Sequence, residues 1–353
     1  MSENASLLSE LRMSWVGDLG EESRKKVQQF GLTPLSEYEG LRTNLARSLA
    51  KTGVWAMKDP DQIFDQIDRG QSYNLLVGFK PSRFHAGHIT LGREIAWHIK
   101  HGAEPFFVVS GHEANTFLST DQARAKVGEF WKTVIRGVLK EDLAFPQYVY
   151  SDVDSPEIRS LKSVVDNKIK IAELLRLYGW NAGEITMNQL NTPGTLTASF
   201  LLPQLISPEK PTLVTADVKQ VTHAEITNKV ARRLNVSPPS FSYRLLLPSL
   251  KSNNGQRMSI EVPNTAVFLG DDPEVNRKKL IKAVSGGRSV NEQEKLGGNP
   301  HKCSFFKIAD LVLKDATLEQ VLQACMSGKN LCGECKNGIV EDITSAISGN
   351  RTI

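Results

Sequence analysis

One stretch constrains the fold more than any other: an apolar run at residues 73–77, followed by a turn that ends in His85-Ala86-Gly87-His88. The apolar run is typical of a buried parallel strand. The residues after the turn, 89–98, have apolar side chains that suit a helix packed on a sheet. A strand-to-helix turn presents unpaired backbone amides and the positive end of a helix dipole, which attract anions. The stretch therefore predicts a place to hold the phosphates of a nucleotide.

Strand and helix patterns alternate along the next 170 or so residues. Apolar strands are predicted at residues 105–110, 147–151, 212–215 and 242–247, and helical or mostly apolar segments at 120–139, 155–177, 195–206 and 220–234. This alternation predicts an α/β fold with a Rossmann-like parallel sheet and crossover helices. Ligands of such sheets bind beyond the carboxyl ends of the strands. Polar residues that follow predicted strands are candidate ligand-binding residues: Glu113, Asp217, Lys219, Gln220 and His223.

The 353 residues suffice for two or three domains. We predict a helical N-terminal extension over residues 1–70, with capping patterns at Ser36 and Glu39 and at residues 59–62. The Rossmann-like domain is predicted over residues 71–255. A loop and a helical domain are predicted over residues 256–353, with helix starts at residues 272–273 and 317–320.

Composition restricts the location and the partners. No apolar run reaches the roughly 18 residues of a membrane span, and residues 1–10 carry two Glu and no basic flank, unlike a secretory signal. We expect a cytoplasmic protein. The net charge of +4 permits a polyanionic partner without requiring one.

Two further stretches indicate chemistry. Residues 253–260 are rich in Asn and Gly and carry one cation, Arg257, near Ser259. Such a loop can close on a triphosphate, and the alternative is an ordinary surface turn. The four cysteines, Cys303, Cys325, Cys332 and Cys335, are separated by 21, 6 and 2 residues. Four thiolates suit Zn²⁺ or a [4Fe–4S] cluster, and the alternative is four unrelated buried thiols.

These motifs, in order, resemble a known family. The sequence His85-Ala86-Gly87-His88 is similar to the first signature of class I aminoacyl-tRNA synthetases. Arg257-Met258-Ser259 stands where their second signature, Lys-Met-Ser-Lys-Ser, is expected. Five further stretches resemble tryptophanyl-tRNA synthetases of archaeal and eukaryotic type: residues 263–269, 271–273, 285–288, 297–300 and 331–335. The resemblance extends from about residue 30 to residue 345.

The resemblance implies an enzyme that makes an aminoacyl-adenylate from tryptophan and ATP with Mg²⁺, and then esterifies tRNA. It also implies a homodimer whose surface lies at about residues 113–200, and a C-terminal domain that binds the anticodon. Some members of the family carry a [4Fe–4S] cluster with nearly this cysteine spacing, which favours iron–sulfur over Zn²⁺. The residues that would surround ATP are Gly78, Lys80, His85, Gly87, His88, Arg257, Met258 and Ser259, with His85, His88, Arg257 and Ser259 acting on the phosphates.

The amino-acid pocket matches the family in part. Gln204 and Gln220 match pocket glutamines of the relatives, and Glu113 falls near the acid that reads the indole N–H. Leu76 stands in place of a tyrosine that touches the indole, and Lys219 stands in place of an aspartate. An alternative role for Lys219 is an ion pair with Asp217.

The second signature also departs from the family. Arg257 and Ile260 replace its two lysines, and Glu261 replaces its last serine, so that a carboxylate would lie near the phosphates. The first hypothesis is a tryptophanyl-tRNA synthetase. The second is a synthetase paralogue that binds nucleotide or RNA with altered or lost aminoacylation. The third, a small-molecule adenylyltransferase sharing only His-x-Gly-His, is disfavoured by the C-terminal cysteines.

Overall fold

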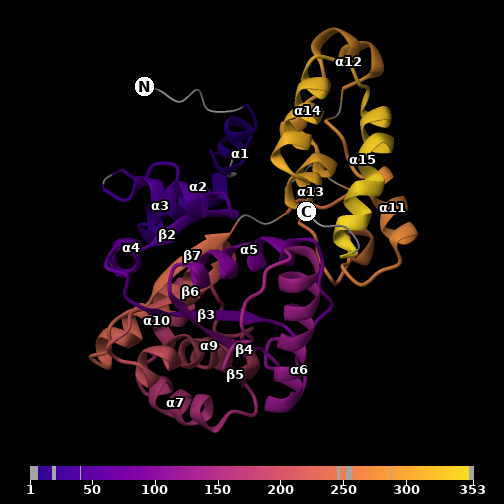
Figure 1. The fold of residues 1–353 in the computed structure, drawn as a ribbon. Coiled ribbons are helices and arrows are strands. Elements are labelled where there is room, and N and C mark those ends of the chain that lie inside the picture. Colours follow the sequence, from indigo (N-terminus) through magenta and orange to yellow (C-terminus); the bar gives the residue numbers. More distant parts are fainter. Residues whose placement is uncertain are drawn as a thin grey trace.

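The computed structural model describes residues 7–17, 21–39, 41–244, 247–251, 257–286 and 288–349. An α/β part and a helical part lie side by side in Figure 1, with the helical part formed by the C-terminal segment of the chain. Within the described residues, no helix combines the length and the apolar character that crossing a bilayer requires.

Seven strands form one sheet in the order β1-β2-β7-β6-β3-β4-β5. They are β1 (Thr33–Pro34), β2 (Val54–Lys58), β3 (Tyr73–Phe79), β4 (Ala103–Val109), β5 (Tyr148–Ser151), β6 (Thr212–Asp217) and β7 (Ser240–Arg244). The strands from β7 to β5 are parallel, whereas β2 runs antiparallel to β7 and β1 antiparallel to β2. The predicted α/β class is confirmed, and the sheet is mixed rather than purely parallel.

Helices cover both faces of the sheet. Side chains alternate across each strand, so a strand that is apolar throughout presents apolar surface on both faces. In β3, Leu75 and Val77 pack in one core with α5 (Gly87–Lys100) and α6 (Thr120–Phe130). Leu76 points to the other face and packs in a second core with α9 (Met187–Ile206) and α10 (Val221–Arg233). Figure 1 shows these helices around the sheet.

Two predicted helices are built differently from the prediction. The segment 120–139 is helical, but its second half, Trp131–Val138, is a π-helix that continues α6. The segment 155–177 forms two helices, α7 (Pro156–Asp166) and α8 (Ile171–Tyr178), rather than one. The start of α9 at Met187 precedes the predicted apolar segment, and Thr186 caps it through Gln189.

The N-terminal region contains α1 (Leu7–Gly17), α2 (Glu21–Phe30), α3 (Thr43–Ala50) and α4 (Asp61–Asp68). The predicted capping box at Ser36 is wrong, because α3 begins at Thr43 and Leu41 is 99% exposed. The all-helical character predicted for residues 1–70 is also wrong, since β2 joins the sheet through β7. Local patterns did not reveal β2 because all but its last residue are fully buried, without alternation.

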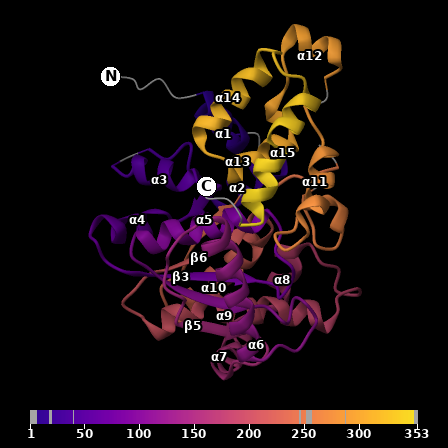
Figure 2. The same ribbon diagram turned by 45° about the vertical axis from the view of Figure 1, so that its right-hand side comes forward.

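The helical part consists of α11 (Pro273–Ile281), α12 (Val290–Leu296), α13 (Ser304–Val312), α14 (Asp315–Met326) and α15 (Cys332–Ile347). Short 3-10 turns lie at Val218–Gln220, Pro263–Thr265 and Pro300–Lys302. The N-terminal α1 lies against α14 and α13 (Figure 2), where Trp15 packs edge-on against Phe306 with ring centroids 6.2 Å apart. Helix α1 thereby packs against the helical part.

Candidate active site

The two imidazoles of the first signature lie together at the amino end of α5. Their ring centroids are 4.5 Å apart. The backbone N–H of Gly87 donates to Nδ1 of His85 over 3.0 Å, so Nδ1 carries the lone pair. In the neutral ring the proton must then be on Nε2, which leaves His85 an N–H donor to offer to a ligand.

Gly87 is required by this arrangement. A Cβ at position 87 would lie 2.7 Å from Cε1 and 2.9 Å from Nδ1 of His85. Contacts of that length force the ring to move, so a larger residue would displace the imidazole. The absence of a side chain also lets a ligand approach the start of α5 closely.

The chain after the second signature fixes the first signature in place. The backbone of Ala86 donates to Val267 O over 2.9 Å, and Leu269 donates to Phe84 O over 2.9 Å. His85 and Phe268 form an isolated β-bridge between these bonds. Two segments far apart in sequence therefore form one wall of the site.

A pocket of about 1470 Å³, its open mouth included, lies at the carboxyl ends of β3, β6 and β7. It is polar and carries both signs of charge. Its lining includes Gly78, Lys80, His85, Gly87, His88, Glu113, Asp217, Lys219, Gln220, His223, Arg244, Arg257, Met258, Ser259, Ile260 and Glu261. The pocket therefore brings both signatures and three of the five predicted amino-acid-binding residues together, where ligands of open α/β sheets bind.

Burial keeps the two imidazoles uncharged. Burial, and then the charge of Arg257, lowers the pKa of His85 to about 4. Burial, and then the charge on His85, lowers the pKa of His88 to about 3. Both rings are therefore neutral at pH 7 in the free protein, and they can offer an anion hydrogen bonds rather than positive charge.

The second-signature segment is tied to the sheet next to this pocket. Met258 is 5% exposed, and its backbone N–H donates to Leu247 O over 3.0 Å. Nη1 of Arg257 lies 3.6 Å from Oδ2 of Asp217, at the end of β6. The Asn- and Gly-rich part of the predicted mobile loop, residues 252–256, lies outside the described residues.

Of the residues predicted to bind the amino acid, Glu113, Lys219 and Gln220 line the pocket. Lys219 is exposed, and its backbone N–H, not its ammonium, contacts Asp217. Burial and the acids Asp152 and Asp217 raise the pKa of Glu113, which Lys80 opposes. These groups can bind a zwitterionic ligand.

Leu76 and Gln204 are not brought to the pocket. Leu76 is 1% exposed within the core under α9 and α10. The amide of Gln204 donates to Pro208 O over 2.9 Å and accepts from Thr212 Oγ1, at the amino end of β6. Gln204 thus lies at the amino ends of the parallel strands, whereas the two imidazoles lie beyond their carboxyl ends.

Two polar pairs at the pocket were not identified from the sequence. The hydroxyl of Tyr178 shares a hydrogen bond with Nδ1 of His223. Nη1 of Arg244 lies 2.6 Å from Oε2 of Glu94, whose side chain is fully buried in α5. The available signals were Glu94 within a mostly apolar helix and Arg244 at the end of a buried strand, because buried charges require partners.

All four cysteines line a separate pocket of about 370 Å³ in the helical part, its open mouth included. Cys303 precedes α13, Cys325 lies in α14, and Cys332 and Cys335 lie in α15. Burial and neighbouring thiols raise the pKa of Cys325 to about 11 and that of Cys335 to about 12. Over the described part of the chain, no three His, Cys, Asp or Glu side chains are grouped so as to hold a metal ion.

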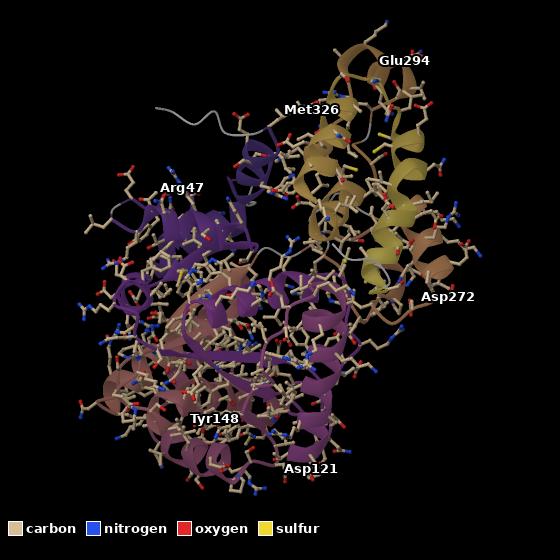
Figure 3. The ribbon with its side chains drawn as sticks, in the orientation of Figure 1. Arg47, Asp121, Tyr148, Asp272, Glu294 and Met326 are labelled. Atoms are coloured by element: carbon tan, nitrogen blue, oxygen red, sulfur yellow. The ribbon has the colours of Figure 1, made fainter. Side chains whose placement is uncertain are left out.

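The cysteine pocket and the imidazole pocket have no lining residue in common. In Figure 3, Met326, which follows Cys325, lies in the helical part. The cysteine pocket is therefore not part of the imidazole site.

A model of the family of class I tRNA synthetases for tryptophan and tyrosine matches residues 69–347. The tryptophan–tRNA ligase of Aeropyrum pernix is 30% identical over 328 residues, covering 88% of this chain and 86% of that protein. That of Methanocaldococcus jannaschii is 27% identical over 335 residues, covering 91% and 88%. The crystal structure of tryptophanyl-tRNA synthetase from A. pernix has the same fold, with a TM-score of 0.75 at 24% identity, covering 95% of this chain and 94% of that one.

Proposed function

The chain belongs to the class I tRNA synthetases for tryptophan and tyrosine, and we propose that its amino acid is tryptophan. The observation that supports synthetase chemistry at this site is that both signature segments line one pocket, the first through His85 and His88 and the second through Arg257. Relatives that cover about nine-tenths of the chain are named tryptophan–tRNA ligases. ATP with Mg²⁺, tryptophan and tRNA are then the substrates, and the cytoplasm remains the predicted location.

The chemistry requires no covalent bond to the protein. The carboxylate of tryptophan attacks the α-phosphorus of ATP and pyrophosphate leaves. A ribose hydroxyl of tRNA then attacks the carbonyl carbon of the adenylate, and AMP leaves. His85 offers an Nε2–H donor to the phosphates at the start of α5, where backbone amides and the helix dipole also favour negative charge. Arg257 neutralises charge on the departing pyrophosphate. Positioning and electrostatic stabilisation supply the rate enhancement.

The test is pyrophosphate exchange into ATP with each standard amino acid in turn. We expect exchange with tryptophan and little with tyrosine. Exchange that depends on tyrosine would contradict the choice of amino acid. ATP binding without exchange for any amino acid would support the second hypothesis, a paralogue that has lost aminoacylation. The exposed Lys219 and Glu261 in the pocket are the observations that favour this alternative.

We propose a homodimer formed through residues 113–200. Four apolar side chains of this segment are exposed: Phe117 at 71%, Met187 at 70%, Ile171 at 60% and Val164 at 48%. A dimer contact through this segment would cover these four side chains. Sedimentation that finds only monomers at micromolar concentration would contradict this proposal.

We further propose that the four cysteines hold a [4Fe–4S] cluster, with Zn²⁺ as the alternative. Four thiols that line one pocket are a suitable donor set for either group. The resemblance of the cysteine spacing to that of family members with a [4Fe–4S] cluster favours iron–sulfur over Zn²⁺. Thiols from α14, from α15 and from the residue before α13 would hold the cluster, which would stabilise the helical part.

Gly298→Ala tests the cysteine site with a small change. A Cβ at position 298 would lie 2.5 Å from Sγ of Cys325, so the thiol must move. After anaerobic purification we expect the broad visible absorbance and the iron content to fall by at least half. Gly333→Ala is the matched control, because a Cβ between the two cysteines of α15 meets nothing within 4 Å. Wild-type protein that contains neither iron nor zinc would contradict the cysteine site itself.

A further inference from the structure

The wall of the nucleotide pocket contains an ion pair that neither signature includes. Glu94 lies in α5, with no exposed surface, and Arg244 ends β7. Their closest atoms, Nη1 and Oε2, are 2.6 Å apart, and the hydroxyl of Ser242 donates to the other carboxylate oxygen. The carboxylate of Glu94 is therefore satisfied from two sides.

Stability alone does not explain this pair. A buried ion pair is often no more stabilising than apolar residues of similar volume, because both charges lose their hydration. The Arg244 side chain retains 13% exposure, and that exposure is to the nucleotide pocket. Glu94 occupies one of its nitrogens, and the described residues provide no partner for its other side-chain donors. The guanidinium is thus fixed at one end and available at the other.

The position of Arg244 is suited to an anion. It lies opposite Asp217 in the register of β6 and β7, and Asp217 is paired with Arg257. Its charge helps to lower the pKa of His88, which places it near the first signature. A cation between the two signature segments, held by a buried carboxylate, is a preorganised electrostatic element.

The second-signature segment itself supplies little positive charge. Arg257 is its only cation among residues 257–261, and Ile260 and Glu261 follow it. The triphosphate of ATP carries several negative charges that the pocket must balance. A rigid arginine is a good ligand for phosphate, because its planar fork loses little freedom on binding.

We propose that Arg244 contacts the phosphate chain of ATP and replaces part of the charge that the second-signature segment lacks. Glu94 is the positioning residue that aims it. This inference rests on the proposed function in requiring ATP as substrate. It adds a phosphate ligand that comes from β7 rather than from either signature.

The experiment compares the binding of ATP and of adenosine by calorimetry, without amino acid. Arg244→Met is expected to weaken ATP binding about 10- to 100-fold, the effect of losing a charged hydrogen bond. Adenosine binding should change less than twofold, because adenosine has no phosphate. Arg244→Lys should recover part of the ATP affinity. Arg83→Met, which removes an exposed arginine paired with Asp271 outside the pocket, is the matched control.

Because Arg244→Met leaves Glu94 buried without its partner, the double variant Glu94→Gln, Arg244→Met is measured as well. It removes both charges and should show the same selective loss of ATP affinity at a melting temperature close to wild type. Equal loss for ATP and adenosine, or no loss for ATP, would overturn the inference. Failure of the wild type to exchange pyrophosphate with any amino acid, with ATP still bound selectively, would refute only the proposed function.

Discussion

Replacing His85 with alanine is expected to slow tryptophan-dependent pyrophosphate exchange by about 10²- to 10³-fold, the usual effect of removing one preorganised donor from a transition state. The donor is Nε2–H, because Gly87 N–H already occupies Nδ1. The effect should fall on the maximal rate more than on the Michaelis constant for tryptophan. Exchange kinetics with both substrates varied separate the two.

Glutamine and asparagine at position 85 test which nitrogen acts. The amide of glutamine can reach the place of Nε2, whereas that of asparagine reaches only the place of Nδ1. We expect His85→Gln to keep about tenfold more activity than His85→Asn. Equal activity of the two variants would show that the donor assignment is wrong. Both variants should have the melting temperature of the wild type, which would show that the difference in activity does not come from a loss of stability.

The pH dependence of the exchange reaction follows from the same geometry. The pKa values of His85 and His88 are lowered to about 4 and about 3, so both rings gain protons only as the pH falls through these values. An unperturbed imidazole would titrate near 6.5. The ratio of maximal rate to Michaelis constant reflects the ionisation of groups in the free enzyme. Ionisation of these two rings should therefore cause no change in this ratio from about pH 5.5 to 8. An inflection near 6.5 that disappears in both His85→Gln and His88→Gln would contradict this.

The sequence predicted the local structure correctly where short-range patterns determine it. The strand at β3, the turn and α5 follow each other directly, so the predicted phosphate site at His85 and His88 required no knowledge of distant contacts. The parallel sheet followed from strand and helix alternation in the same way. Strand β2 was not predicted, because it is almost fully buried and shows no alternation of apolar and polar residues. The strand β7, with which it pairs, is about 180 residues away in the sequence.

Two of the five residues predicted to bind the amino acid lie away from the pocket, because matching positions to relatives ignores the direction of each element. Gln204 lies near the carboxyl end of α9, which leads into the amino end of β6. Its side chain therefore cannot reach the carboxyl ends of the strands, where the pocket lies. Leu76 alternates with Leu75 and Val77 and is therefore committed to the other core. The ion pair of Arg244 and Glu94 was not predicted for another reason. An ion pair between two elements can be recognised only when the positions of both elements in the fold are known.

Replacing Arg257 with methionine is the other change with a large expected effect. We expect pyrophosphate exchange to fall by about 10²- to 10³-fold, because Arg257 is the only cation of residues 257–261 and faces the pocket. The Michaelis constant for pyrophosphate should rise, and that for tryptophan should not. Arg257→Lys keeps the charge and should stay within about tenfold of wild type. Unchanged exchange in Arg257→Met would remove the second signature from the mechanism.

The ion pair with Asp217 explains how Arg257 can be held next to the pocket and yet remain available. The two groups are 3.6 Å apart, with the side chains 41% and 25% exposed, so water screens the pair and it contributes about 0.2–1 kcal/mol. The phosphates of ATP can therefore displace Asp217 at little expense. Asp217→Asn keeps an oxygen that can accept from Lys219 N–H and removes the competing charge. Its Michaelis constant for ATP should fall by up to about fivefold, and a rise would mean that Asp217 aims Arg257 rather than competing for it.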